Sequence, residues 1–191
     1  LYGTETGNAE YCADELAEAL TRAGFMAEAV DMEDFSPAEL PVYPVAFVVT
    51  STYGNGDPPA SAEGLLRELQ EGGLQLSALN YAVCGLGDSS FAHFAQCGKD
   101  FDEALSECGA RAMFDRVDCD ADYDIPFEHF KESALGHLKA NPGLFSGIRS
   151  GSDYVGTSMP GAHEAAVDGP RAVTRDRPFL ATVTKKRLLS R

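Results

Sequence analysis

The stretch YPVAFVVTSTYGNGDPP, residues 43–59, decides the fold class. Its first half, Tyr43 to Ser51, is continuously apolar around three valines and Phe47, as in a strand that other elements cover on both faces. Its second half, Thr52 to Pro59, holds two glycines and two prolines and predicts a loop. A buried strand ending in such a loop is typical of a parallel sheet.

Strand and helix signals alternate on both sides of that stretch. The end of a first strand (residues 1–2), then residues 25–30, 79–85 and 113–117, are expected to be the other strands. Apolar residues at helical spacing predict helices over 8–22, ended by Gly24, and around 65–69, 94–108 and 127–138. We therefore expect an α/β fold, a doubly wound five-stranded parallel sheet with helices on both faces.

Charge separates the chain into two parts. The 191 residues carry 15 Lys and Arg against 30 Asp and Glu, a net charge of −15, which disfavours a nucleic-acid binder. Residues 1–140 hold 26 acids and 7 bases, whereas residues 141–191 hold 4 acids and 8 bases. The acidic part points to a basic partner or is an ordinary acidic surface. The longest apolar run, Val45 to Val49, is too short to span a membrane, and no secretory leader is visible.

The two ends of the sequence look incomplete. Residues 141–177 contain six Gly, three Pro and four Ser, the composition of a flexible linker. Residues 178–191 begin with a weakly alternating stretch that reads as a lone strand, which is not stable by itself. We therefore expect a folded domain over 1–140, a linker over 141–177 and the opening of a second domain over 178–191.

Cysteine and histidine usage argues against a disulfide framework and against a metal site. The five cysteines are odd in number and form no C-x-x-C pair, which suits core residues in a reducing cytosol and predicts a cytoplasmic protein. The four histidines lack metal-ligand spacing, so no metal site is expected.

The first loop, Gly3 to Asn8, lies between a strand end and a helix start. Unsatisfied N–H groups at such a helix end form an anion site. Thr4 and Thr6 add hydroxyl donors, Gly7 allows close approach of the backbone, and Asn8 can donate a hydrogen bond or cap the helix. No lysine follows, so a phosphate monoester fits better than a nucleoside triphosphate. The alternative is a helix cap that binds nothing.

Further loops follow the later strands at the same sheet edge. In the second loop Tyr53 either stacks on a flat ligand or packs its own loop. In the third loop, Gly85 and Gly87 would bring the backbone close to a ligand. The Phe91 ring either stacks on that ligand as a second ring or lies in the core, and Phe94 is expected mainly in the core. In the fourth, four acids between Asp118 and Asp124 form a solvated helix start, a docking face or a rim near a ring.

Three motifs together carry a resemblance to a known family: Thr4-x-Thr6-Gly7-Asn8, Thr52-Tyr53-Gly54-x-Gly56-Asp57-Pro58 and Gly85-Leu86-Gly87-Asp88. They resemble the FMN-binding, flavodoxin-like domain of diflavin reductases, such as NADPH–cytochrome reductases, over residues 1–140. The runs 98–102 and 115–118 look most like the branch of the sulfite reductase flavoprotein subunit. Residues 177–183 resemble the first strand of the family's FAD-binding barrel.

The resemblance implies a sheet of order 2-1-3-4-5 and an FMN site. Thr4, Glu5, Thr6, Gly7 and Asn8 would hold the phosphate, and Tyr53 and Phe91, where the family usually has Tyr, would stack on the two faces of the ring. The remaining implied cofactor-binding residues are Thr52, Gly54, Asn55, Gly56, Gly85, Leu86, Gly87, Asp88, Phe94 and Asp122.

The resemblance also implies a function, electron transfer without acid–base catalytic residues. FAD would take hydride from NADPH in a reductase domain of the same chain, and FMN would pass electrons to a basic haem or iron–sulfur partner such as the sulfite reductase hemoprotein. The fragment alone is not expected to oxidise NADPH. The alternatives are a stand-alone flavodoxin-like carrier and a non-enzymatic module such as a signalling receiver. The receiver is disfavoured because Thr50-Ser51-Thr52 lacks its phosphoacceptor Asp.

Overall fold

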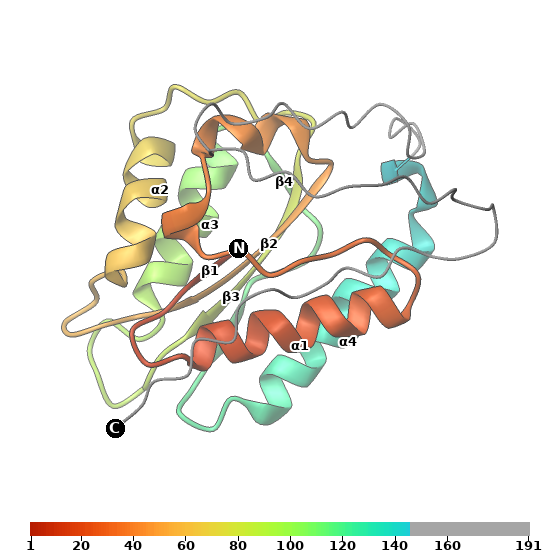
Figure 1. Cartoon of the computed structure of the whole chain (residues 1–191). Helices are drawn as coiled ribbons and strands as arrows, with labels where there is room; N and C mark the ends of the chain where they lie inside the picture. The colour runs from red at the N-terminus through yellow and green to blue at the C-terminus, as the bar shows by residue number, and fades with distance from the viewer. Residues whose placement is uncertain (146–191) are drawn as a thin grey trace, which may run out of the picture. The chain divides into compact units, whose positions relative to one another are not determined.

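The computed structural model describes residues 1–145, which form a parallel sheet covered by helices on both faces (Figure 1). The expectations for residues 146–191, namely most of the linker and the orphan strand, lie outside the described residues. In chain order the elements are β1 (Tyr2–Gly3), α1 (Asn8–Arg22), η1 (Met32–Asp34), η2 (Pro37–Val42), β2 (Val45–Ser51), α2 (Ala60–Gln70), β3 (Asn80–Leu86), α3 (Gln96–Glu107), β4 (Arg111–Ala112), β5 (Val117–Cys119), α4 (Asp124–Ala140) and η3 (Pro142–Phe145).

The sheet is ordered β1-β2-β3-β4, and β5 pairs with β3 further along the same edge. All pairs are parallel, with Gly3 beside Thr50 and Thr50 beside Gly85. The α/β class and the helices on both faces are therefore confirmed. The arrangement is compatible with the order 2-1-3-4-5, whose outermost place would fall to residues 25–30.

Two strand predictions were wrong in detail. Residues 25–30 form no strand. Pairing with β1 is limited to a bridge between Asp31 and Tyr2, in which the Tyr2 N–H donates to the Val30 carbonyl, because β1 offers just two residues as partners. The strand expected over 113–117 is instead two short strands on either side of residues 113–116. In that gap Phe114 packs edge-on against Phe130, and Arg116 turns to two carboxylates, so the chain leaves the ladder.

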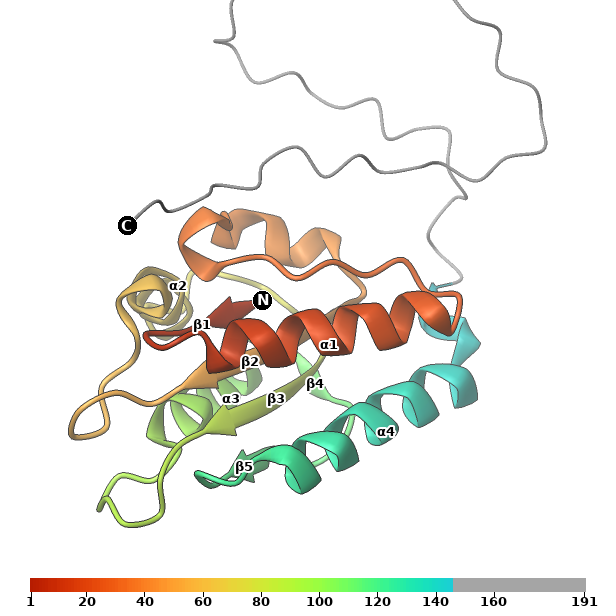
Figure 2. The same cartoon turned by 60° about the horizontal axis from the view of Figure 1, so that its bottom comes forward.

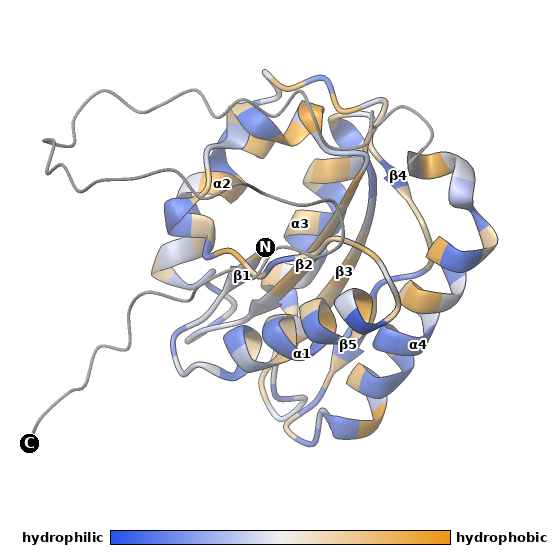
Figure 3. Ribbon diagram, turned by 45° about the vertical axis from the view of Figure 1, so that its right-hand side comes forward, coloured by the Kyte–Doolittle hydropathy of each residue, from blue (hydrophilic) through white to orange (hydrophobic). Residues whose placement is uncertain are grey.

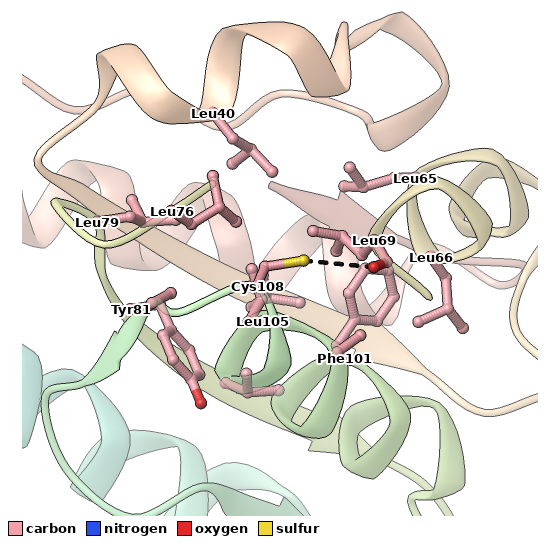
Figure 4. Close-up of a cluster of buried hydrophobic side chains, with 14 of the residues drawn as sticks. Leu40, Leu65, Leu66, Leu69, Leu76, Leu79, Tyr81, Phe101, Leu105 and Cys108 are labelled. Carbon is pink, nitrogen blue, oxygen red and sulfur yellow. Dashed lines mark hydrogen bonds between the residues drawn. The ribbon is translucent and has the colours of Figure 1, made fainter. Parts of the chain in front are cut away.

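The helices form one layer on each face of the sheet. In Figures 1 and 2, α1 and α4 lie side by side on one face, whereas α2, α3, η1 and η2 cover the other. In Figure 3 the central strands β2 and β3 are coloured mainly as hydrophobic, whereas the helices carry both hydrophobic and hydrophilic residues. Beneath α2 and α3 lies a cluster of buried side chains that includes Leu69, Phe101 and Leu105, where the Cys108 thiol donates to the Leu69 carbonyl (Figure 4).

All five cysteines are buried and free, as expected for core residues. Burial raises the pKa of the Cys12 and Cys97 thiols to about 12, so both stay protonated at neutral pH. Cys119 ends β5 with its sulfur 3.6 Å from that of Cys84. Across residues 1–145, none of the helices is long and apolar enough to cross a bilayer.

Candidate functional site

Four loops meet at the carboxyl edge of the sheet, where parallel α/β folds place their ligands. They follow β1, β2, β3 and β5, and together they enclose a pocket of about 270 Å³. Its walls are Thr6, Asn8, Ser51, Thr52, Tyr53, Gly54, Leu86, Gly87, Asp88, Phe91, His93, Phe94, Ala95, Asp120, Ala121 and Tyr123. The structure thus brings together loops that the sequence separates by more than a hundred residues.

The first loop presents the open N-terminus of α1. Gly7 precedes the helix in the left-handed region, with φ of 88°, where glycine alone is unstrained, and has no side chain to cap the helix. Its N–H donates to the Thr4 hydroxyl oxygen at 2.9 Å, which closes the loop. Thr6 and Asn8 line the pocket. Free helical N–H groups and neutral side-chain donors make this end suited to an anion.

Glu5 lies apart from the other residues of the first loop. Its carboxylate accepts a hydrogen bond from the Ala60 N–H at 2.8 Å, at the first residue of α2, and Glu5 does not line the pocket. The negative charge is therefore held by a second helix N-terminus rather than beside that of α1.

Two aromatic rings from different loops line the pocket while remaining largely exposed. Tyr53 keeps 60% of its surface accessible and Phe91 keeps 58%, so neither ring packs into the core. The loop of Tyr53 is fixed by reciprocal hydrogen bonding between Tyr53 and Asp57 and by Gly56, whose φ is 110°. A Cβ on Gly56 would lie 2.7 Å from the Cβ of His93, which ties this loop to the third one. Asn55 does not line the pocket.

The third loop uses its two glycines differently. A Cβ on Gly87 would lie 2.8 Å from the Ala95 nitrogen, and Gly87 lines the pocket. Gly85 is not among the residues that line the pocket; it lets α3 approach β3, because its backbone contacts Gly98. Asp88 lines the pocket and accepts from the Ser90 N–H and hydroxyl, which holds the turn before Phe91.

Phe94 belongs to the pocket rather than to either buried cluster. It is half-buried, its ring lies 5.8 Å from the Lys99 ammonium, and it lines the pocket beside Ala95. Ala95 is the one described non-glycine residue in the left-handed region, with φ of 51°. Thr52 supports the same corner, since its hydroxyl oxygen accepts from the Cys97 N–H at 3.2 Å.

In the fourth loop Asp120, and not Asp122, reaches the pocket. The Asp120 carboxylate accepts from the Ser89 hydroxyl, from the Ser89 N–H at 2.8 Å and from the Ala121 N–H, and these bonds hold its pKa below the usual value. Tyr123, whose pKa is raised by partial burial, closes the wall beside it. Asp122 is exposed and outside the lining.

Sequence reasoning missed several wall residues, among them His93, Ala95, Asp120, Ala121 and Tyr123. The acids of the fourth loop indicate a carboxylate near the ligand, but the sequence does not show which one. β5 ends at Cys119, so Asp120 is the acid that directly follows the strand and reaches the pocket. His93 and Ala95 carried no signal, because a turn before α3 and not a motif brings them to the wall.

The donor set suits a flat aromatic ring that carries a phosphate. Two exposed rings offer stacking surfaces, an open helix N-terminus offers anion donors, and the nearest loop acid is turned away. Among residues 1–145, no group of three or more His, Cys, Asp or Glu is placed to hold a metal ion.

Comparison with known proteins agrees with this chemistry. The family model described as Flavodoxin matches residues 1–132. The sulfite reductase (NADPH) flavoprotein alpha-component of Bacillus subtilis is 35% identical over 185 residues, 96% of this chain and 28% of that protein. The corresponding Photobacterium profundum protein is 40% identical over 140 residues, 73% of this chain and 23% of that protein. This chain thus spans about a quarter of the length of those relatives.

Solved structures show the same fold. A flavodoxin of Streptococcus pneumonia TIGR4 superposes with a TM-score of 0.66 and 26% identity, covering 73% of this chain and 95% of that one. A mutant flavodoxin of Pseudomonas aeruginosa superposes with a TM-score of 0.64 and 29% identity, covering 72% of this chain and 95% of that one.

Proposed function

Because the chain belongs to the flavodoxin family, we propose that it is the FMN-binding electron-transfer domain of an NADPH-dependent diflavin reductase. A flavodoxin domain implies FMN as its cofactor. The observation that carries the proposal is the pair of exposed rings, Tyr53 and Phe91, on separate loops of one pocket beside the open N-terminus of α1.

Different residues of the pocket would hold different parts of FMN. The α1 N–H groups, Thr6 and Asn8 would bind the phosphate, with Thr4 closing the loop. Tyr53 and Phe91 would cover the ring and keep water from its faces. Gly87 and Asp88 would approach its edge. When bound, FMN supplies the electron-transfer chemistry, and the protein supplies position and electrostatics.

The source and the acceptor of the electrons belong to the same proposal. The alignment with the Bacillus subtilis relative covers 185 residues and so extends past the flavodoxin match, which supports an FAD- and NADPH-binding domain following in the same chain. The acidic surface favours a haem or iron–sulfur acceptor with a basic face, such as a sulfite reductase hemoprotein. The five free cysteines support a reducing compartment such as the cytoplasm.

A stand-alone electron carrier is the second candidate. It is favoured by the solved flavodoxins, since this chain covers 95% of the solved chain of one of them. The reading frame around the chain separates the two: FAD- and NADPH-binding motifs downstream support the reductase, and a stop codon shortly after residue 191 supports the carrier.

The stacking role of Tyr53 gives the decisive test. We expect Tyr53→Ala to raise the FMN Kd by about ten- to a hundredfold, because an aromatic–ring contact worth roughly 1–3 kcal/mol is lost. Tyr53→Phe keeps the ring and is the control, with an affinity within a few-fold of the unaltered protein. Flavin fluorescence titration measures both. Unaltered protein that takes up no FMN would refute the proposed function.

A further inference from the structure

Glu5 lies in the first loop, Gly3 to Asn8, which would hold the FMN phosphate and is called the phosphate loop below. Its carboxylate, however, is hydrogen-bonded to a different element. The Glu5 Oε1 atom accepts the Ala60 N–H at 2.8 Å. Ala60 is the first residue of α2, whose N-cap, Pro59, offers no side-chain acceptor. Glu5 therefore caps α2 from a distance of 55 residues along the chain and satisfies one of its free N–H groups.

The bond joins two loops that touch the cofactor site. The loop of Tyr53 runs from Thr52 to Pro59 directly into α2, and the first loop runs from Gly3 into α1. Among the hydrogen bonds of residues 1–145, that from Ala60 to Glu5 is the one that ties residues 4–8 to the start of α2. Close packing supports it, because a Cβ on Gly3 would lie 2.7 Å from the Ala62 Cβ.

The same bond also keeps the negative charge of Glu5 away from the N-terminus of α1. A carboxylate beside the N-terminus of α1 would compete with a phosphate for its N–H groups and repel it. Held at α2, the Glu5 charge is stabilised by a second helix dipole and leaves the first to the ligand.

We infer that Glu5 is a positioning residue, not an FMN ligand: it locks the phosphate loop to the loop of Tyr53 and orders both before flavin binds. The inference rests on the proposed FMN function. Loops that are ordered in advance lose less entropy on binding, so removal of the lock weakens binding without removing any contact to the ligand.

The test compares FMN with riboflavin, which has the same ring and no phosphate, on the 191-residue chain. We expect Glu5→Ala to raise the Kd of both flavins by a similar factor of about three to thirty, the range that a lost N-cap corresponds to. Glu5→Gln keeps an acceptor oxygen and is expected to restore both affinities to within a few-fold. Glu63→Ala removes another acid from the first turn of α2 and is the matched control.

Amide hydrogen exchange supplies a direct readout in the protein without flavin. Pro58 and Pro59 carry no amide hydrogen, so exchange at the start of α2 reports on Ala60 first. Glu5→Ala is expected to speed exchange there, and Glu5→Gln to restore protection, whereas Glu63→Ala leaves the Ala60 amide protected.

The outcomes are distinct. A loss confined to FMN, with riboflavin unchanged, would make Glu5 a determinant of phosphate binding alone and overturn the inference. Tighter FMN binding in both Glu5→Ala and Glu5→Gln would make it merely a repelling charge, which also overturns it. Failure of the unaltered chain to bind either flavin refutes the proposed function instead. Circular dichroism excludes a variant that has not folded.

Discussion

Asp120 connects the third and fourth loops of the pocket through a single carboxylate. It accepts from the hydroxyl and the N–H of Ser89 and from the N–H of Ala121, although it is only partly buried. The bonds favour its charged form and so hold its pKa below that of an unfolded chain. Phe91 follows two residues after Ser89, so the Asp120 carboxylate helps to hold the segment that carries this ring.

Acidification is therefore expected to loosen this wall of the pocket. A carboxyl whose pKa is lower in the folded than in the unfolded state stabilises the fold above its unfolded pKa of about 3.9. That stability is lost as the pH falls through the lower, folded pKa. Asp120→Asn is expected to be less stable than the unaltered protein at pH 7 and to lose less stability on acidification.

Thermal unfolding midpoints between about pH 7 and pH 3 measure this difference. Asp122→Asn is the control, because Asp122 lies on the same loop without these hydrogen bonds among residues 1–145. Equal acid sensitivity of Asp120→Asn and the unaltered chain would contradict the assignment.

The contact between β3 and α3 depends on two glycines. A Cβ on Gly98 would lie 2.8 Å from the Gly85 Cα, and this neighbour is backbone that cannot rotate away. α3 can therefore lie close to the strand that leads into the third loop. The helix begins at Gln96, directly after Ala95 of the pocket wall, so this packing also fixes one wall of the site.

Gly98→Ala is expected to destabilise the fold by roughly 1–3 kcal/mol, because the added methyl overpacks a helix–strand contact. Gly136→Ala in α4 is the matched control, since a Cβ there meets nothing within 4 Å. It is expected to stabilise the protein by roughly 0.5–1 kcal/mol through helix propensity. Urea unfolding compares the two. Stabilisation by both alanines would show that β3 and α3 have room to separate.

The whole domain carries an excess of negative charge that its own cations do not relieve. Residues 1–140 hold 26 acids against 7 bases. Two of those bases are already occupied by pairs of acids: Arg116 by Asp102 and Asp118, and Lys131 by Glu15 and Glu128. The remaining acids repel one another, and this self-repulsion destabilises the compact state.

Salt is therefore expected to stabilise the protein at neutral pH. Raising NaCl from about 10 mM to about 0.5 M shortens the Debye length from about 30 Å to a few ångströms and screens the self-repulsion. The unfolding midpoint at pH 7 should rise by several degrees, and the rise should shrink near the isoelectric point of about 4.5. A midpoint that falls with added NaCl at pH 7 would contradict this account.

The sequence predicted the elements that carry strong local signals. Apolar periodicity located α1, whose bounds Asn8–Arg22 were confirmed, and the buried run of β2. Short elements were less predictable, because their state depends on partners. Residues 25–30 look like a strand but face a β1 of two residues, and residues 113–116 leave the ladder as Phe114 and Arg116 find other contacts.

The sequence by itself determined the fold class, the loops of the site and the kind of ligand they suit, because periodicity, glycine and hydroxyl donors act locally. Only the tertiary structure decided what single side chains do within those loops. It turned Glu5 to α2, gave Gly85 to helix packing, brought Phe94 to the pocket and chose Asp120 over Asp122. The physical reason is that each of these roles depends on a partner distant in the chain, whose position no local pattern encodes.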